Sequence, residues 1–190
     1  NQGNDMTDDI HAAKMRRIKE ARDRMMEGKV GEKGLLIVHT GKGKGKSSSA
    51  FGMVMRCLGH EMKVGIVQYV KGAWDTGEAR LLKRFPDLCE IKTLGEGFTW
   101  ETQDKTRDIA AARAGWEKAK ELIRNPEIRM VLLDEINIAL RYDYLDIGEV
   151  LEFLKAEKPP LTHVVLTGRN AKEELIEAAD LVTEMTLIKH

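Results

Sequence analysis

A segment rich in glycine and lysine carries the residues best suited to chemistry. It reads VHTGKGKGKSSSAFG, spans residues 38–52, and lies between an apolar stretch and a helix-compatible stretch. Glycines let successive backbone N–H groups point at phosphate oxygens, and the helix that follows adds the positive end of its dipole. Lys46 would bring a charge to the distal phosphates, and Ser47 would offer its hydroxyl to Mg²⁺. The segment therefore predicts a phosphate-binding loop for a nucleotide.

The predicted nucleotide ligands extend along this loop and into the helix. The pattern G-x-x-x-x-G-K-[ST] is met at Gly45, Lys46 and Ser47, but its first glycine falls on Thr40, which the extra glycines partly offset. The alternative is a glycine-rich linker that is basic by accident, and the flanking strand and helix argue against it. The residues expected to bind the nucleotide are Gly41, Lys42, Gly43, Lys44, Gly45, Lys46, Ser47, Ser48 and Arg56.

A second signal is an apolar run that ends in two acids. In IRMVLLDEIN the run closes with Asp134 and Glu135. A carboxylate at the end of a buried strand beside a phosphate loop can hold Mg²⁺, because this cation prefers oxygen ligands. Ser47, Asp134 and Glu135 are therefore the predicted metal ligands. Glu135 could instead orient a water toward a γ-phosphate, and a solvated acidic turn is the bland alternative.

The loop GEGFTWETQD places two aromatic residues close together. Phe98 and Trp100 point to the same side if the backbone is extended. They could form a stacking platform for a flat ligand, or they could cover the edge of the sheet, which their composition and position favour. Gln68, Lys71 and Arg169 close other predicted strands, and no role follows for them from the sequence, since charged residues there are usually solvated.

The overall composition excludes several classes of protein. The 190 residues suit one substantial core, and 31 basic residues balance 31 acidic ones, so no broad nucleic-acid-binding face is expected. Cys57 and Cys89 lie far apart and form no CxxC pair, which is typical of a reducing cytoplasm. The apolar stretches are short and interrupted by acids, and the polar, acidic start is unlike a secretory signal, so neither membrane insertion nor secretion is expected.

Alternating segment types predict the fold. Short, continuously apolar runs with helix-like pieces between them are typical of a parallel sheet covered on both faces, a three-layer α/β/α fold of the P-loop NTPase class. A helical segment precedes this alternation, so residues 1–33 are expected to form an arm and residues 34–190 the catalytic domain. The expected strands lie within residues 34–40, 63–70, 89–94, 128–135, 162–168 and 181–188, and the expected helices within 48–58, 77–85, 104–124, 147–155 and 172–179.

Six segments taken together resemble one family. They are TGKGKGKSSSAFG, VGIVQYVKG, GEGFTWETQD, VLLDEIN, YDYLDIGEVLEFL and VVLTGRNAKEELIEAADLVTEM. In this order they are similar to the P-loop family of ATP:corrinoid adenosyltransferases, also called cob(I)yrinic acid a,c-diamide adenosyltransferases. The resemblance implies a RecA-like fold and transfer of the 5′-deoxyadenosyl group of ATP to Co(I) of a corrinoid, with triphosphate released whole and ATP bound in reversed orientation.

The resemblance also implies roles for particular residues and partners. Phe98 and Trp100 match an aromatic pair that displaces the lower axial ligand of the corrin, which makes Co(II) easier to reduce. With Lys46 they are the implied catalytic residues, while Glu135 would serve Mg²⁺ and the N-terminal helix would cover the site. A cytoplasmic homodimer with a flavoprotein electron donor is also implied. Serines at 47–49 and Asn137 stand where the family commonly has threonine.

Other functions compatible with a phosphate loop make different predictions. A RecA-like ATP hydrolase would use Asp134 and Glu135 equally well, but it would release phosphate rather than intact triphosphate. A nucleoside kinase of the thymidine-kinase type usually carries a CxxC zinc site, which Cys57 and Cys89 cannot form. A non-enzymatic nucleotide switch would bind ATP tightly without turning over any corrinoid.

Overall fold

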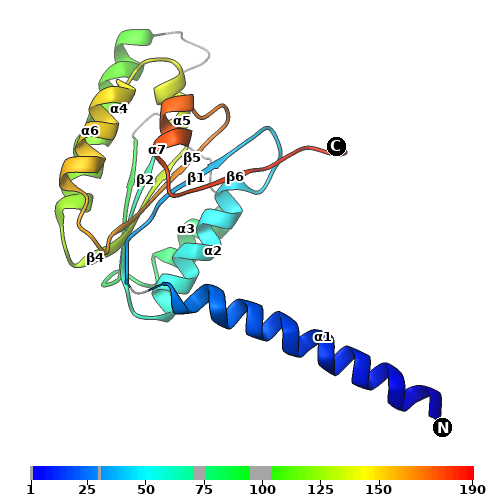
Figure 1. The fold of residues 1–190 in the computed structure, drawn as a ribbon. Coiled ribbons are helices and arrows are strands. Elements are labelled where there is room, and N and C mark those ends of the chain that lie inside the picture. The colour runs from blue at the N-terminus through cyan, green and yellow to red at the C-terminus, as the bar shows by residue number, and fades with distance from the viewer. Residues whose placement is uncertain (1, 30, 71–75, 95–103) are drawn as a thin grey trace. The chain divides into compact units, whose positions relative to one another are not determined.

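A computed structural model describes residues 2–29, 31–70, 76–94 and 104–190 (Figure 1). The strands in these ranges are β1 (Leu36–Thr40), β2 (Lys63–Gln68), β3 (Cys89–Thr93), β4 (Ile128–Asp134), β5 (His163–Thr167) and β6 (Leu181–Glu184). They form one sheet in the order β3-β2-β4-β5-β1-β6, and every neighbouring pair is parallel. Each strand lies within one of the six predicted segments, which confirms an α/β fold with a parallel sheet.

Helices cover both faces of the sheet and complete the three predicted layers (Figure 1). One face carries α2 (Lys46–Gly59) and α3 (Thr76–Leu82). The other carries α4 (Lys105–Arg124), α5 (Ile136–Arg141), α6 (Ile147–Glu157) and α7 (Glu173–Ala178). One apolar cluster fills the space between the sheet and each helical layer, so the two faces have separate cores. A parallel sheet buried in this way needs strands that are apolar on both sides.

Strand β4 shows how an uninterrupted apolar run serves both clusters. Met130 and Leu132 pack in the cluster under α2, whereas Val131 and Leu133 pack in the cluster under α4, α5 and α6. Successive side chains of a strand point to opposite faces, so the part of this strand from Met130 to Leu133 is apolar on both faces. The run ends where the sheet ends, and Asp134 follows as the first charged residue at its carboxyl end.

Two helices begin at capping aspartates. The Asp104 side chain accepts a hydrogen bond from the backbone N–H of Arg107 at 3.1 Å, and Asp146 accepts one from Glu149 at 2.9 Å. These bonds satisfy N–H groups that have no partner within the helix. They fix the starts of α4 and α6 within one residue of the positions predicted from the sequence.

Helix α5 is the element that the sequence did not predict. It covers only Ile136–Arg141, directly after the acidic strand end, and Glu135 begins it in a left-handed backbone conformation with φ of 63°. A helix this short spans less than two turns, so its apolar residues show no clear helical period. Its position nevertheless matters, because it follows immediately on the predicted metal ligands.

The chain divides into two compact units, residues 1–32 and 33–190. The first unit holds α1 (Gln2–Glu27), the extra N-terminal helix expected from the sequence. Apolar side chains on this helix, including Met6, Ile10 and Met25, are exposed. No helix in the described parts of the chain is long and apolar enough to cross a bilayer.

Candidate functional site

The carboxyl ends of the central strands bring the predicted site residues together. In the sheet register, Gln68 at the end of β2 lies opposite Asp134 of β4, and Leu133 of β4 lies opposite Leu166 of β5. Thr167, the next residue of β5, lies opposite His39 of β1. Ligands of such sheets bind beyond the carboxyl ends of the strands. The phosphate loop follows β1 at this edge, as predicted.

The loop depends on glycine at two positions for its backbone path. Gly41 has φ of 102° and Gly45 has φ of 109°, values that residues with a side chain adopt at a cost. Gly45 immediately precedes α2, so the loop delivers Lys46 and Ser47 to the first turn of a 14-residue helix. The N–H groups of that turn point out of the helix end, where an anion is favoured.

A second segment of the chain holds the loop from behind. The backbone N–H of Gly43 donates to the carbonyl of Met185 at 2.7 Å, and the N–H of Met185 donates to the carbonyl of Thr40 at 2.8 Å. A Cβ added to Gly41 would lie 2.4 Å from the Met185 carbonyl oxygen. The glycines of the loop are therefore required by packing as well as by backbone conformation. A cavity of about 660 Å³ lies beside this contact, bordered by residues that include Gly41 and Lys42.

Lys46 is folded back into the loop. Its side chain is only 8% exposed, and its ammonium group donates to the carbonyl of Gly43 at 2.7 Å. Burial lowers the pKa of Lys46, the negative charge of Glu135 opposes this shift, and the positive charge of Arg169 adds to it. Among the described residues this ammonium donates to the Gly43 carbonyl alone, and two of its three N–H donors remain for an anionic ligand.

A chain of hydrogen bonds joins the loop to the acidic strand end. The Ser47 hydroxyl donates to Asp134 Oδ1 at 2.9 Å, and the Thr167 hydroxyl donates to the same oxygen at 3.0 Å. Thr167 in turn accepts from the backbone N–H of Glu135 at 2.9 Å. Asp134 is fully buried. Hydroxyl and carboxylate oxygens so close together are the donor set that Mg²⁺ prefers, so the residues present fit this cation.

Glu135 lies next to these groups and shares their electrostatic environment. Burial raises the pKa of Glu135, and the neighbouring charge of Asp134 raises it further, while the positive charges of Lys46 and Arg169 oppose both effects. A carboxylate in this setting is stabilised in its charged form when another cation approaches. The arrangement therefore favours a bound positive charge near Asp134 and Glu135.

The remaining predicted ligands divide into two groups. Lys42, Lys44 and Ser48 are exposed on the loop and on the first turn of α2. Arg56 lies in the last turn of α2, and at a rise of about 1.5 Å per residue this is roughly 15 Å from Lys46 along the helix axis. The fold does not gather Arg56 with the other predicted ligands. Phe98 and Trp100 lie outside the described residues.

Two residues near the site were not assigned from the sequence. Thr167 is fully buried and bonds both Asp134 and the backbone of Glu135, so it orients the acidic pair. The charge of Arg169 acts on both Lys46 and Glu135. In the sequence, the signal for Thr167 and Arg169 was their position at the end of a predicted strand, in the segment LTGR. That signal is weak, because threonine and arginine at strand ends are common without any such role.

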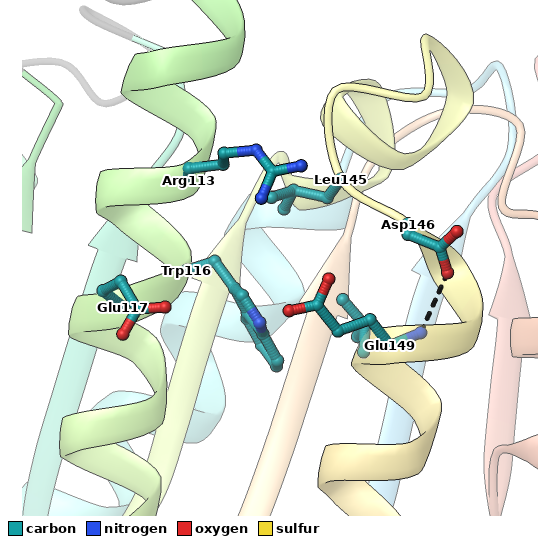
Figure 2. A pocket seen from close by; sticks show the side chains of 7 residues that line it. Arg113, Trp116, Glu117, Leu145, Asp146 and Glu149 are labelled. Carbon is teal, nitrogen blue, oxygen red and sulfur yellow. Dashed lines mark hydrogen bonds between the residues drawn. The ribbon is translucent and has the colours of Figure 1, made fainter.

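A second hollow lies between α4 and the start of α6 (Figure 2). It holds about 140 Å³ and shares no residue with the phosphate loop. The buried Trp116 lines it and packs edge-on against Phe153, with ring centroids 5.3 Å apart. Figure 2 shows the Glu149 carboxylate directed toward the Trp116 indole, and the dashed line marks the cap formed by Asp146. We interpret this hollow as a feature of helix packing.

A family model and several named proteins are similar to this chain over nearly its whole length. A family model described as ATP:corrinoid adenosyltransferase BtuR/CobO/CobP matches residues 32–190. A Sinorhizobium sp protein named corrinoid adenosyltransferase is 65% identical over 181 residues, which cover 95% of this chain and 85% of that protein. Proteins of the same name from Pseudomonas aeruginosa and Escherichia coli (strain K12) are 52% and 40% identical, over 96% and 97% of this chain and 90% and 93% of those proteins.

Among solved structures, the crystal structure of the RadB recombinase is similar to this one. The TM-score is 0.48 at 13% sequence identity, and the match covers 87% of this chain and 80% of that one.

Proposed function

The chain belongs to the ATP:corrinoid adenosyltransferase family and is a corrinoid adenosyltransferase, and we propose that the cluster around Lys46, Ser47 and Asp134 holds the triphosphate of ATP as a leaving group. The family and activity predicted from the sequence are thereby confirmed. They favour adenosyl transfer over the alternative of ATP hydrolysis. The observation that carries the proposal is the Ser47–Asp134 hydrogen bond of 2.9 Å beside a buried, folded-back Lys46.

The proposed reaction is a nucleophilic displacement at the ribose. The cobalt of a Co(I) corrinoid supplies an electron pair to C5′ of ATP and forms a Co–C bond, while the C5′–O bond breaks. The triphosphate leaves with the electron pair of the broken C5′–O bond, and the cobalt is formally oxidised from Co(I) to Co(III). No group of the protein has to remove a proton. The tasks left to the protein are to align C5′ with cobalt and to stabilise the departing negative charge.

The phosphate loop performs the second task in this proposal. The N–H groups of the first turn of α2 and the Lys46 ammonium would contact phosphate oxygens. Lys46 bonds the Gly43 carbonyl, and on binding a phosphate it would exchange this neutral acceptor for an anionic one. Lys42, Lys44 and Ser48 are exposed beside it and would add further donors. This part of the proposal rests on the backbone path and on the burial of Lys46.

Ser47, Asp134 and Glu135 would hold Mg²⁺ with the phosphates. The bound cation neutralises part of the charge that develops on the leaving triphosphate. Ser47 and Asp134 lie 2.9 Å apart, and Thr167 orients Asp134. Because burial and Asp134 together raise the pKa of Glu135, the approach of a cation would favour its ionised form. Glu135 would then serve the metal rather than a water.

Phe98 and Trp100 are proposed to act on the corrinoid rather than on ATP. Two aromatic side chains beneath the corrin would displace its lower axial ligand and exclude water. Four-coordinate cobalt in an apolar environment is easier to reduce from Co(II) to Co(I). The proposal for these two residues rests on the GFTW sequence and its family resemblance alone.

The assembly of the enzyme forms a separate part of the proposal. We expect a cytoplasmic homodimer that receives electrons from a flavoprotein, and an arm of residues 1–33 distinct from a catalytic domain of residues 34–190. The division of the chain into residues 1–32 and 33–190 supports the arm. Removing residues 1–32 tests it, because the remaining unit should still bind MgATP. Light scattering of the full chain measures the number of subunits directly.

The test of the reaction is anaerobic turnover with identified products. The protein is mixed with MgATP and chemically reduced cob(I)alamin, corrinoid absorbance is followed, and the phosphate product is separated by ion exchange. We expect adenosylcobalamin and tripolyphosphate in equal amounts. Unchanged corrinoid with accumulating ADP and phosphate would instead identify a hydrolase and refute the leaving-group role of the loop. Repeating the assay with cobinamide identifies which corrinoid is preferred.

A further inference from the structure

The turn that follows β5 has a backbone that only glycine adopts readily. Gly168 has φ of 132°, and a Cβ added there would lie 2.8 Å from the Cβ of Asn137. Its N–H donates to the carbonyl of His39 at the end of β1, at 3.1 Å. The turn therefore runs close against two other elements, the strand that leads into the phosphate loop and the short helix α5.

Asn137 supplies the second contact to this glycine. It lies in the first turn of α5, is 1% exposed, and donates from Nδ2 to the Gly168 carbonyl at 2.9 Å. Its Oδ1 is also buried and has no hydrogen-bond partner among the described residues. A buried acceptor without a partner costs stability, so an apolar side chain of similar size would suit the packing better. The contribution specific to asparagine here is the bond to Gly168.

A hydrogen bond also fixes the other end of this turn, at Ala171. The backbone N–H of Ala171 donates to the Thr40 hydroxyl at 3.0 Å, and Thr40 is the last residue of β1. Arg169 thus lies between two anchored residues, Gly168 and Ala171, and its own side chain is exposed. An arginine on a backbone fixed at both ends loses less conformational freedom when its guanidinium binds a ligand.

Arg169 follows the end of β5 at the edge of the sheet that carries the site. It comes two residues after Thr167, which lies opposite His39 in the sheet and bonds Asp134. In agreement with this position, its positive charge lowers the pKa of both Lys46 and Glu135. Two cations close to one another repel unless an anion lies between them. Tripolyphosphate is such an anion, and guanidinium binds phosphate oxygens in a bidentate manner.

We propose that Asn137 is a positioning residue for Arg169: its bond to the Gly168 carbonyl fixes the turn that directs the guanidinium toward the triphosphate. The inference rests on the proposed function of the phosphate loop and adds a ligand, Arg169, and the residue through which that ligand is set. Asn137 itself does not touch the nucleotide. Its effect passes through one peptide carbonyl and the next residue in the chain.

A double-mutant cycle on the full-length protein tests this inference. The variants are Asn137→Ala, Arg169→Ala and the two combined, with Arg113→Ala and Asn125→Ala as exposed controls of the same residue types. The measured quantity is the dissociation constant for inorganic tripolyphosphate with Mg²⁺, by titration calorimetry. Thermal unfolding of each variant reports folding separately. If Asn137→Ala does not fold, Asn137→Ser takes its place, since a serine hydroxyl is too short to span the same distance.

We expect Asn137→Ala and Arg169→Ala each to weaken tripolyphosphate binding about tenfold, and the double variant to bind no more than about twofold more weakly than Arg169→Ala. This coupling is the signature of one residue acting through the other. Equal losses from the Asn137 substitution in both backgrounds would overturn the inference, and so would a lower Tm with unchanged affinity.

Failure of the inference and failure of the proposed function give different results. If the Lys46→Ala variant binds tripolyphosphate as tightly as the wild type, the phosphate loop is not the leaving-group site and the proposed function fails. If Lys46→Ala abolishes binding while Arg169→Ala leaves it unchanged, the loop keeps its role and only the inference about Arg169 and Asn137 is lost.

Discussion

The Ser47 hydroxyl donates to Asp134 Oδ1 across 2.9 Å, although 87 residues separate them in the chain. This bond joins the start of α2 to the end of β4 and holds two predicted Mg²⁺ ligands within reach of one cation. Both oxygens would be available to Mg²⁺, and the hydrogen bond keeps these two predicted ligands close together.

Removing the Ser47 hydroxyl tests its predicted role in metal binding. Ser47→Ala should raise the Mg²⁺ concentration needed for half-maximal activity by about tenfold or more, because one oxygen ligand is lost. Ser47→Thr should retain near-normal dependence, since it keeps the hydroxyl. Ser49→Ala is the matched control, because Ser49 is an exposed serine two residues further along α2. A Mg²⁺ titration of initial rates distinguishes these variants, and equal effects at both serines would contradict the assignment.

Removing the Lys46 ammonium should reduce transfer more severely. Lys46→Ala should lower kcat/KM for ATP by about a hundredfold or more, because the buried cation that we propose to face the leaving group is lost. Lys155→Ala, an exposed lysine in the last turn of α6, provides the matched control. Initial rates with chemically reduced cob(I)alamin measure both variants. A small loss for Lys46→Ala would contradict the proposed role of the phosphate loop in holding the leaving group.

The aromatic loop can be tested by comparing two cobalt oxidation states. Trp100→Ala should reduce the rate from Co(II) substrate and reductant by about tenfold or more, whereas the rate with pre-reduced Co(I) should change little, since the proposed role is in lowering the energy of reduction. Trp100→Phe should preserve most of the Co(II) route. Equal losses on both routes would remove the axial-ligand role and leave a role in folding.

The raised pKa of Glu135 predicts how the stability of the protein depends on pH in the absence of nucleotide. Burial and the charge of Asp134 raise the pKa of Glu135, so the folded state holds this proton more tightly than the unfolded chain. Stability from this group is therefore complete below the ordinary carboxyl pKa and is lost as pH rises through the raised folded value. Glu135→Gln should unfold at a higher temperature than the wild type at about pH 7, with no difference near pH 4.

Calorimetric scans at several pH values make this comparison. Glu152→Gln is the control, because Glu152 is exposed on α6. A higher Tm for Glu135→Gln that is independent of pH would show that packing, rather than ionisation, causes the change.

The loop glycines should differ in their sensitivity to alanine. Gly45→Ala should destabilise the protein by about 1–2 kcal/mol through its left-handed φ alone, because nothing lies within 4 Å of the added Cβ. Gly41→Ala should cost more, since its Cβ would also lie 2.4 Å from the Met185 carbonyl oxygen. Gly52→Ala, in the exposed part of α2, should stabilise by about 0.5–1 kcal/mol. Urea unfolding in the absence of nucleotide ranks the three.

Local sequence determined the elements and the two main halves of the site. The six strands in the described part of the chain follow from apolar runs, because a strand buried on both faces must be largely apolar. The loop glycines and Lys46–Ser47 were predicted because a bound phosphate requires backbone N–H groups and a cation. The same reasoning identified the acidic pair, with Asp134 as the last residue of β4 and Glu135 directly after it. The short helix α5 escaped it, since fewer than two turns give no periodic signal.

The tertiary structure alone decided which residues act together. The strand order brings Thr167 beside Asp134, the chain near Met185 packs behind Gly41, and Asn137 reaches the carbonyl of Gly168. The fold also leaves Arg56 at the far end of α2 from the loop. Motifs and hydrophobic patterns report local chemistry and burial, whereas hydrogen bonds between residues distant in sequence depend on register and on helix placement. These are set only when the sheet and its two helical layers pack together.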